Sequence, residues 1–309
     1  MSISFDGDWL VDQSKKGETI ILRVIKRLHS ATTKFQEVQL VETEAYGRAL
    51  ILDDSIQAAA KDEFIYHECL VHPAMLATPN PVRVAVLGGG EGATIREVLK
   101  HKSVESVTMI DIDREVVEFC REYLPGFSQG AFDDPRTKLV FDDARKWIEQ
   151  QAPESLDVVI IDITEPLEGG PACMLFTSEF YSMVGRTLTQ AGSMLVQAGP
   201  ADPHGHMMFT RIFKSIQSAF VRTYPLVSYV PSFADNWGFV LACCGDAKIH
   251  TISEIDQAMA ERISGKLSYY DGQTQAHIVN LPLYLRKSLA GPLGPFTDTD
   301  PPKMGPGIR

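Results

Sequence analysis

The chain has 309 residues, a formal net charge of −11 and a sequence pI near 5.2. This negative charge argues against binding to nucleic acid or to an anionic membrane surface, and it favours a cationic partner. We expect a cytoplasmic protein, because no eighteen apolar residues follow one another and no basic stretch near the N-terminus leads into an apolar segment. The five cysteines follow neither a metal-ligand spacing nor a disulfide framework.

Two different rhythms of apolar residues predict two domains. Short, often alternating apolar runs separated by turn signals predict a small antiparallel β domain over residues 1–62. Over residues 63–290, nearly continuous apolar runs alternate with amphipathic segments of helical period. This pattern predicts an α/β domain with a doubly wound, mostly parallel sheet whose strands are buried on both faces. Residues 291–309 are rich in Gly, Pro and Asp, so we expect a flexible tail there.

A glycine-rich turn follows the first apolar run of the larger domain. Its sequence is Gly88-Gly89-Gly90-Glu91-Gly92. Glycines at such a turn let the backbone approach a ligand closely, which is typical of nucleotide binding. Glu91 would place negative charge where a helix N-terminus normally favours phosphate. The turn therefore favours a nucleotide-like ligand that carries positive charge.

Acidic residues follow four successive predicted strands. Ligands of an open α/β sheet bind outside the carboxyl ends of its strands, so these side chains should converge on one rim. Converging carboxylates repel one another unless cations are present, so the rim suits a cationic ligand. The acids are Glu91, then Asp111 and Asp113, then Asp142 and Asp143, and finally Asp162 and Glu165. Taken singly, Asp113, Asp142 and Asp143 could equally cap the helices that follow them.

The spacing of these residues leaves several ligands open. Asp111 lies 19 residues after Gly92, an interval at which nucleotide-binding folds place an acid on ribose hydroxyls. The same pattern fits a dinucleotide or S-adenosylmethionine, and the sulfonium charge of the latter suits the acids better. Hard metal cations also take oxygen ligands, but these acids lie on separate strands with no compact loop, so we expect no metal site.

Six motifs follow one another along the chain: Tyr66-His67-Glu68, Gly88 to Gly92, Arg96 to His101, Asp111-Ile112-Asp113, Phe132 to Arg136 and Asp162 to Pro166. In their sequence and order they resemble the motifs of the polyamine aminopropyltransferases, the spermidine synthase family, and the resemblance covers about residues 18 to 245. Within the family, three segments look most like thermospermine synthases: Glu168 to Ala172, Gln197 to Pro200 and Ala234 to Gly238. Gln129 to Arg136 is similar instead to bacterial enzymes that use agmatine or triamines.

The resemblance implies a Rossmann-like catalytic domain, like that of class I S-adenosylmethionine-dependent methyltransferases, behind a small β domain. It also implies transfer of an aminopropyl group from decarboxylated S-adenosylmethionine, a co-substrate, to a polyamine, with release of 5′-methylthioadenosine. No permanently bound cofactor and no metal would be needed. The partners would be the polyamine substrate and further copies of the chain in a homodimer or homotetramer.

Roles for single residues follow from the resemblance. Asp162 matches the family's proton acceptor and would be the catalytic base. Glu91 would attract the ammonium group of the decarboxylated donor and repel the carboxylate of ordinary S-adenosylmethionine. The donor-binding residues would be Gln36, Gly88, Gly90, Glu91, Asp111, Asp142, Asp143, Pro171 and Ala172. The acceptor-binding residues would be Tyr66, His67, Glu91, Asp162, Glu165, Phe233 and Trp237. His67 could instead fix its loop by a hydrogen bond, and Tyr66 and Trp237 could be core aromatics.

Three departures from the family pattern concern the acceptor. Glu165 stands where the family commonly has aspartate, Phe233 replaces a tyrosine of many spermidine synthases, and Trp237 adds a large aromatic face. These changes favour spermidine or another long amine over putrescine alone. Two other functions stay open: an S-adenosylmethionine-dependent methyltransferase, which the same glycine and acid pattern supports, and a non-catalytic polyamine-binding relative, against which Asp162 argues.

Overall fold

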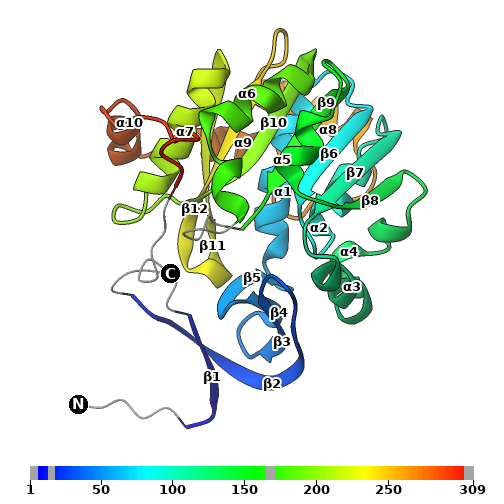
Figure 1. Ribbon diagram of the computed structural model, residues 1–309, viewed down its shortest axis with the longest axis vertical. Helices are drawn as coiled ribbons and strands as arrows, with labels where there is room; N and C mark the ends of the chain where they lie inside the picture. The colour runs from blue at the N-terminus through cyan, green and yellow to red at the C-terminus, as the bar shows by residue number, and fades with distance from the viewer. Residues whose placement is uncertain (1–5, 13–17, 165–170, 303–309) are drawn as a thin grey trace.

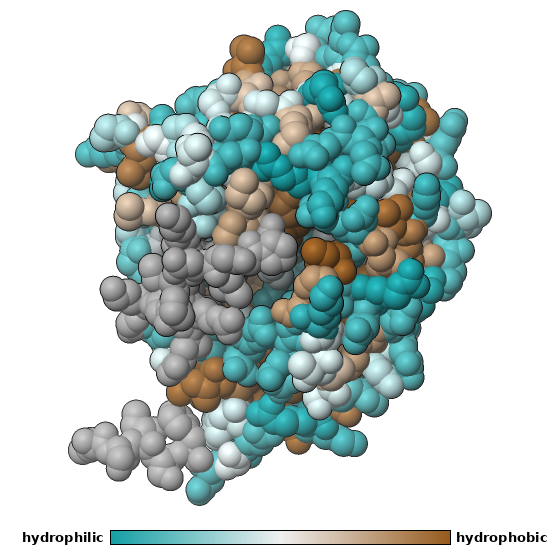
Figure 2. All heavy atoms as spheres, in the orientation of Figure 1, coloured by the Kyte–Doolittle hydropathy of each residue, from teal (hydrophilic) through white to brown (hydrophobic). Residues whose placement is uncertain are grey.

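The computed structural model describes residues 6–12, 18–164 and 171–302, which form two sheets with helices around the larger one (Figure 1). Within these residues, no helix has both the length and the apolar character needed to cross a membrane. The face seen in Figure 2 is mostly hydrophilic, with apolar residues in small separate groups.

The N-terminal sheet is antiparallel throughout, and each strand pairs with the next along the chain. Its strands are β1 (Asp8–Asp12), β2 (Ile20–Thr32), β3 (Glu37–Thr43), β4 (Gly47–Leu52) and β5 (Ser55–Ala59). β3 to β5 bury apolar side chains that contact helices of the larger domain, with Val38, Leu40 and Leu50 among them. The N-terminal sheet therefore lies against the larger domain near the carboxyl ends of its strands.

The central sheet has the order β11-β12-β10-β9-β6-β7-β8. Its strands are β6 (Arg83–Gly88), β7 (Ser106–Asp111), β8 (Thr137–Phe141), β9 (Leu156–Asp162), β10 (Leu188–Pro200), β11 (Arg222–Val230) and β12 (Asp235–Cys243). Neighbours from β10 to β8 are parallel, whereas β12 is antiparallel to both β10 and β11. The predicted α/β class with an N-terminal antiparallel sheet is confirmed.

Helices cover both faces of the central sheet, as the continuous apolar runs predict (Figure 1). Successive strand residues point to opposite cores: Val84 and Val86 of β6 join one apolar cluster, while Ala85 and Leu87 join the other. The helices are α1 (Glu63–Ala77), α2 (Ala93–Leu99), α3 (Arg114–Tyr123), α4 (Pro125–Ser128), α5 (Ala144–Glu149), α6 (Ser178–Thr187), α7 (Met207–Ala219), α8 (Ile252–Arg262), α9 (Gly272–Val279) and α10 (Leu283–Leu289). Short 3₁₀ helices are η1 (Ala131–Asp133), η2 (Pro171–Leu175) and η3 (Pro231–Phe233).

Helix α1 is buried along most of its length: every residue from Tyr66 to Ala77 is buried. It packs against α2 and against strands β9 to β12. Its buried polar side chains, such as Tyr66, His67 and His72, are hydrogen-bonded to other elements. At its start, the Asp62 carboxylate accepts a 2.6 Å hydrogen bond from the backbone N–H of Ser232 in η3. This bond fixes η3 beside the first turns of α1.

The expectation of a flexible tail is wrong for Gly291 to Pro302. Phe296 is only 4% exposed and packs in the core beside α6 and α7. Asp298 pairs with Arg145 at 2.6 Å, and Asp300 pairs with Arg211 at 2.7 Å. Composition alone misses this arrangement, because one buried aromatic and two ion pairs are enough to hold a Gly- and Pro-rich segment in place. Residues 303–309 lie outside the described residues.

Candidate active site

The glycine turn joins the ends of two neighbouring strands. Gly88 pairs with Asp162 across β6 and β9, and it has a φ of +83°. A Cβ added at Gly88 would lie 2.1 Å from the backbone oxygen of Asp162, so a side chain there would clash. The N–H of Gly89 donates a 3.0 Å hydrogen bond to that oxygen. These glycines therefore bring the turn that carries Glu91 against the end of β9.

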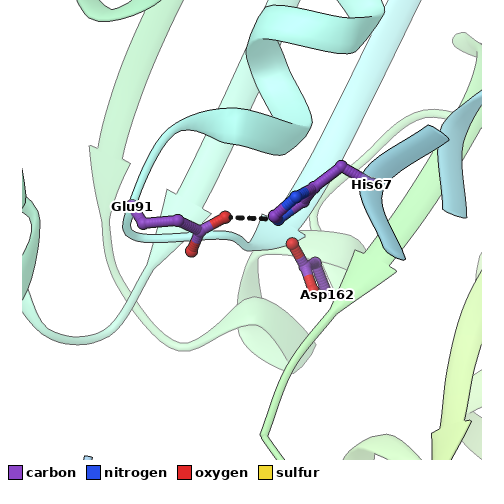
Figure 3. Close-up of side chains that lie close together, drawn as sticks. All are labelled: His67, Glu91 and Asp162. Carbon is purple, nitrogen blue, oxygen red and sulfur yellow. Dashed lines mark hydrogen bonds and ion pairs between the residues drawn. The ribbon is translucent and has the colours of Figure 1, made fainter. Parts of the chain in front are cut away.

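Three ionisable side chains from different elements point toward one another (Figure 3). His67 comes from α1, Glu91 from the turn after β6, and Asp162 from the end of β9. One ligand-type atom from each of the three lies within 4.8 Å of the others. Glu91 and Asp162 are half-buried, and His67 is buried. The structure thus brings together the residue expected to bind the donor and the residue expected to act as base.

His67 bridges two carboxylates. Its Nδ1 lies 2.7 Å from Oε2 of Glu63 and 2.8 Å from the backbone oxygen of Glu63, both of which accept hydrogen bonds. Its Nε2 lies 2.9 Å from Oε1 of Glu91. A neutral imidazole has one N–H, so donation from both nitrogens requires the imidazolium form. Burial opposes that charge, but hydrogen bonds to Glu63 and Glu91 outweigh it and raise the pKa of His67 to about 10.

Asp162 is prepared to accept a proton. The hydroxyl of Tyr66 donates to its Oδ1 at 2.7 Å, and the hydroxyl of Thr94 donates to its Oδ2. Burial raises the pKa of Asp162 to about 6, and the charge of Glu91 acts in the same direction. The positive His67 and the two hydroxyls oppose this rise. A carboxyl with this pKa is ionised at neutral pH and can act as a general base.

The end of β7 carries a second acidic site. Burial raises the pKa of Asp111 to about 7, and the charges of Asp113, Glu91 and Asp162 add to the effect, although the N–H of Asp113 donates to it at 2.8 Å. Asp113 caps α3 through its side chain and also accepts a 3.1 Å hydrogen bond from Gln36, which lies in the connection between β2 and β3. Gln36 is thereby placed beside this strand end. A cationic ligand next to Asp111 would relieve the repulsion among these acids.

The structure places the other residues expected to bind the donor in different surroundings. Asp143 caps α5 by accepting hydrogen bonds from the N–H groups of Arg145 and Lys146. Asp142 is exposed, and its N–H donates to the backbone oxygen of Asp111 at 3.1 Å. Ala172 lies half-buried in η2. Glu165 lies outside the described residues, as does the side chain of Pro171.

An aromatic wall stands beside Asp162. Tyr66 contacts Phe233 with ring centroids 5.8 Å apart, and Phe233 contacts Trp237 with centroids 4.9 Å apart. Three of the residues expected on the acceptor side, Tyr66, Phe233 and Trp237, therefore contact one another in sequence. The indole N–H of Trp237 is buried and has no hydrogen-bond acceptor among the described residues. A wall of this kind can pack against methylene groups while the acids hold amines.

The cluster of His67, Glu91 and Asp162 has residue types that can also ligate a metal ion. Metal binding needs a free lone pair on the imidazole. Both nitrogens of His67 are occupied by hydrogen bonds to carboxylates, so the ring offers none in this arrangement. An ammonium group, which needs only acceptor oxygens, fits the two carboxylates better.

Sequence reasoning missed three residues of the site. Glu63 lies four residues before His67, a spacing that puts both on one helix face and could have indicated the pair. Arg96 holds both oxygens of Glu63, at 3.0 and 2.9 Å, from α2. Thr94 reaches Asp162 from the first turn of α2. The contacts of Arg96 and Thr94 cross between elements, and no local spacing signals them.

Comparison with known proteins places this geometry in a family. A model described as "Spermidine synthase tetramerisation domain" matches residues 8–60, and one described as "Spermine/spermidine synthase domain" matches residues 63–254. A polyamine aminopropyltransferase from Sulfurisphaera tokodaii is 41% identical over 86% of this chain and 88% of its own length. A thermospermine synthase from Arabidopsis thaliana is 41% identical over 78% of this chain and 71% of its own length.

Solved structures agree with these matches. A spermidine synthase in complex with the transition-state analogue AdoDATO has a TM-score of 0.85 at 28% identity, covering 93% of this chain and 96% of that chain. Spermidine synthase from Thermotoga maritima has a TM-score of 0.83, also at 28% identity, and covers 93% of this chain and 95% of its own. The relatives are aminopropyltransferases, which decides against the methyltransferase alternative. The chain belongs to the spermine/spermidine synthase family of polyamine aminopropyltransferases.

Proposed function

We propose that this enzyme transfers the aminopropyl group of decarboxylated S-adenosylmethionine to a polyamine, with Asp162 as the base. The observation that carries the proposal is the convergence of Asp162 and Glu91 on one partly exposed point between the donor-side and acceptor-side residues. His67 compensates part of the repulsion between these two carboxylates, and cationic ligands would relieve the rest. Donor and acceptor both supply positive charge.

The reaction is a direct displacement. The nitrogen of the acceptor amine forms a bond to the carbon next to the sulfonium, while the bond between that carbon and sulfur breaks and its electron pair stays on sulfur. Polyamine amines are largely protonated at neutral pH, like lysine side chains, so a proton must leave before or during attack. Asp162 accepts that proton, and Tyr66 and Thr94 hold its carboxylate in place. Neutral 5′-methylthioadenosine is released.

Glu91 selects the donor by charge. Despite its burial, hydrogen bonding to the positive His67 lowers the pKa of Glu91 and keeps it ionised. The decarboxylated donor ends in an ammonium, which an ionised glutamate attracts. Ordinary S-adenosylmethionine carries a carboxylate at that end as well, which the same glutamate repels. We assign the ribose to Asp111 and the adenine side to Asp142, Asp143, Pro171 and Ala172, with Gln36, Gly88 and Gly90 shaping the donor site.

The acceptor is a long amine such as spermidine. Phe233 and Trp237 line the acceptor side with aromatic carbon, which suits the additional methylene groups of a triamine. Glu165 would hold the distal ammonium of such an acceptor. The product is then a tetraamine.

We also infer that the chain works as a homotetramer in the cytoplasm. The match of residues 8–60 to a tetramerisation domain supports this, and so do apolar side chains exposed on that sheet, such as Ile25 at 65%. Light scattering should give four times the 34.2 kDa mass of the chain. The mass of a single chain would contradict the inference.

A panel of amines tests the proposed function. Pure protein incubated with decarboxylated S-adenosylmethionine should release 5′-methylthioadenosine faster with spermidine than with putrescine, agmatine, cadaverine or norspermidine. Chromatography of the spermidine reaction should show a tetraamine and identify the isomer. Silence across the whole panel would contradict aminopropyl transfer and favour a non-catalytic polyamine-binding protein. A preference for putrescine would contradict only the proposed acceptor.

Substitution of the base tests the mechanism. Asp162→Asn should lower turnover by a factor on the order of 10² to 10⁴, because the amide cannot take the amine proton. Donor affinity, measured by calorimetry, should survive, since Glu91 and Asp111 are unchanged. The matched control is Asp246→Asn, which makes the same chemical change at an exposed aspartate and should leave turnover as it is. An equal loss of donor binding in Asp162→Asn would show a structural role instead.

A further inference from the structure

Six side chains of alternating charge form a row from near the surface to the active site. We call this set the charge row: Lys100, Glu97, Arg96, Glu63, His67 and Glu91. Each member contacts the next through an ion pair of 2.7 to 2.9 Å, and positive and negative groups alternate along it. Helix α1 supplies Glu63 and His67, and α2 with its C-cap supplies Arg96, Glu97 and Lys100.

The charge row is shielded from water. The exposed fraction of the side chain is 22% for Lys100 and 13% for Glu91 at the two ends, and it is lower for each member between them. An isolated charge in such a place would be strongly unfavourable, and it persists only when neighbours of opposite sign compensate it. Loss of one charge within the row therefore changes the ionisation of the next group along.

Glu63 lies between Arg96 and His67 in the charge row. Both of its oxygens are held by Arg96, so its carboxylate has a fixed orientation toward Nδ1 of His67. Burial opposes its charge, but His67 and Arg96 lower the pKa of Glu63 to about 2. Glu91, the other partner of His67, faces the ligands, and the ammonium of the donor will compete for it. Glu63 accepts from Nδ1, on the opposite side of the ring from Glu91.

The groups that face Asp162 show how the imidazolium of His67 affects the ionisation of this carboxyl group. Tyr66 and His67 face Asp162 from α1, Thr94 from α2, and Glu91 and Asp111 from neighbouring strand ends. The two acids favour protonation of Asp162, and the two hydroxyls are uncharged donors. Of these groups within the described part of the chain, His67 is the one that carries positive charge, and it is itself faced by Glu63 and Glu91. Its charge favours the ionised form of Asp162.

We propose that Glu63 is a positioning residue for aminopropyl transfer: by accepting the Nδ1 hydrogen of His67 it keeps an imidazolium beside Asp162, so that the base is ionised at neutral pH. This inference rests on the proposed role of Asp162. Glu63 does not touch the reacting atoms, and it acts through His67.

The experiment is the pH dependence of kcat/KM for Glu63→Gln and for the wild-type enzyme, from pH 5 to pH 9. In the wild type, the rate should fall as the pH falls through about 6, because Asp162 becomes protonated there. The glutamine can still accept the Nδ1 hydrogen but carries no charge, so His67 should lose its proton within this range. The acid limb, meaning the low-pH side of the plot of kcat/KM against pH, should then shift by about one unit to higher pH. The reason is that loss of a nearby cation raises a carboxyl pKa by at least that much.

The shape of the profile separates positioning from a merely structural role. With the acid limb moved from about 6 to about 7, Glu63→Gln should be about five-fold slower than the wild type at pH 6 and about two-fold slower at pH 7. At pH 9 it should approach the wild-type rate. A uniform loss at every pH, with the acid limb unmoved, would overturn the proposal. The matched control is Glu44→Gln, which removes the ion pair between Glu44 and Arg23, two side chains that are each more than half exposed. This variant should leave the acid limb at its wild-type pH.

Two further variants keep the result decisive. In a His67→Gln background, adding Glu63→Gln should produce no further shift of the limb, and an additional shift would contradict action through His67. If Glu63→Gln fails to fold, Glu63→Asp keeps the charge for Arg96 and withdraws it from Nδ1 by one methylene. The limb should then move in the same direction by a smaller amount, and an unmoved limb would overturn the proposal.

Absence of turnover in the wild type would count against the proposed function, whereas turnover with an unmoved limb in Glu63→Gln counts against positioning alone.

Discussion

Repulsion among carboxylates at one edge of the central sheet is the constraint on which this site depends. Parallel strands place their carboxyl ends together, so Glu91, Asp111 and Asp162 arrive at the same rim from three neighbouring strands. Burial makes their charges more costly and raises the pKa values of Asp111 and Asp162. His67 compensates part of this charge, and the remainder is available to bind cations. This imbalance is the physical basis of the proposed binding of a sulfonium and of ammonium groups.

The positive charge of His67 acts unequally on two neighbouring acids, so that the pKa of Glu91 is lowered and the pKa of Asp162 stays raised. Glu91 touches His67 directly and stays ionised, which suits a group that binds an ammonium. Asp162 receives hydrogen bonds from Tyr66 and Thr94 instead, and its pKa lies near 6, which suits a group that takes up and releases a proton. Helix α1 makes this division possible, because its buried first turns present Tyr66 to one acid and His67 to the other.

The sequence predicted which acids meet at the rim of the sheet, while the roles given to them stay predictions. The glycine turn and the acids after four apolar runs are local signals, and parallel-sheet topology then requires Glu91, Asp111 and Asp162 to meet. The charge row could not be predicted in this way, because the contact between Arg96 and Glu63 joins residues of two different helices. Composition was misleading for the C-terminal segment, where Phe296 fills the core and Asp298 pairs with Arg145. The orientation of β12 was likewise not contained in its apolar pattern, since a buried strand shows the same run in either direction.

The protonation state of His67 is the central claim, because both the charge of Glu91 and the ionisation of Asp162 depend on it. It can be measured from the ¹⁵N chemical shifts of the ring in protein labelled at histidine, with His67→Gln used to assign the signal. Both ring nitrogens of His67 should remain protonated from pH 5 to pH 8, because its pKa is raised to about 10. A ring that loses a proton near its ordinary pKa of about 6.5 would contradict it.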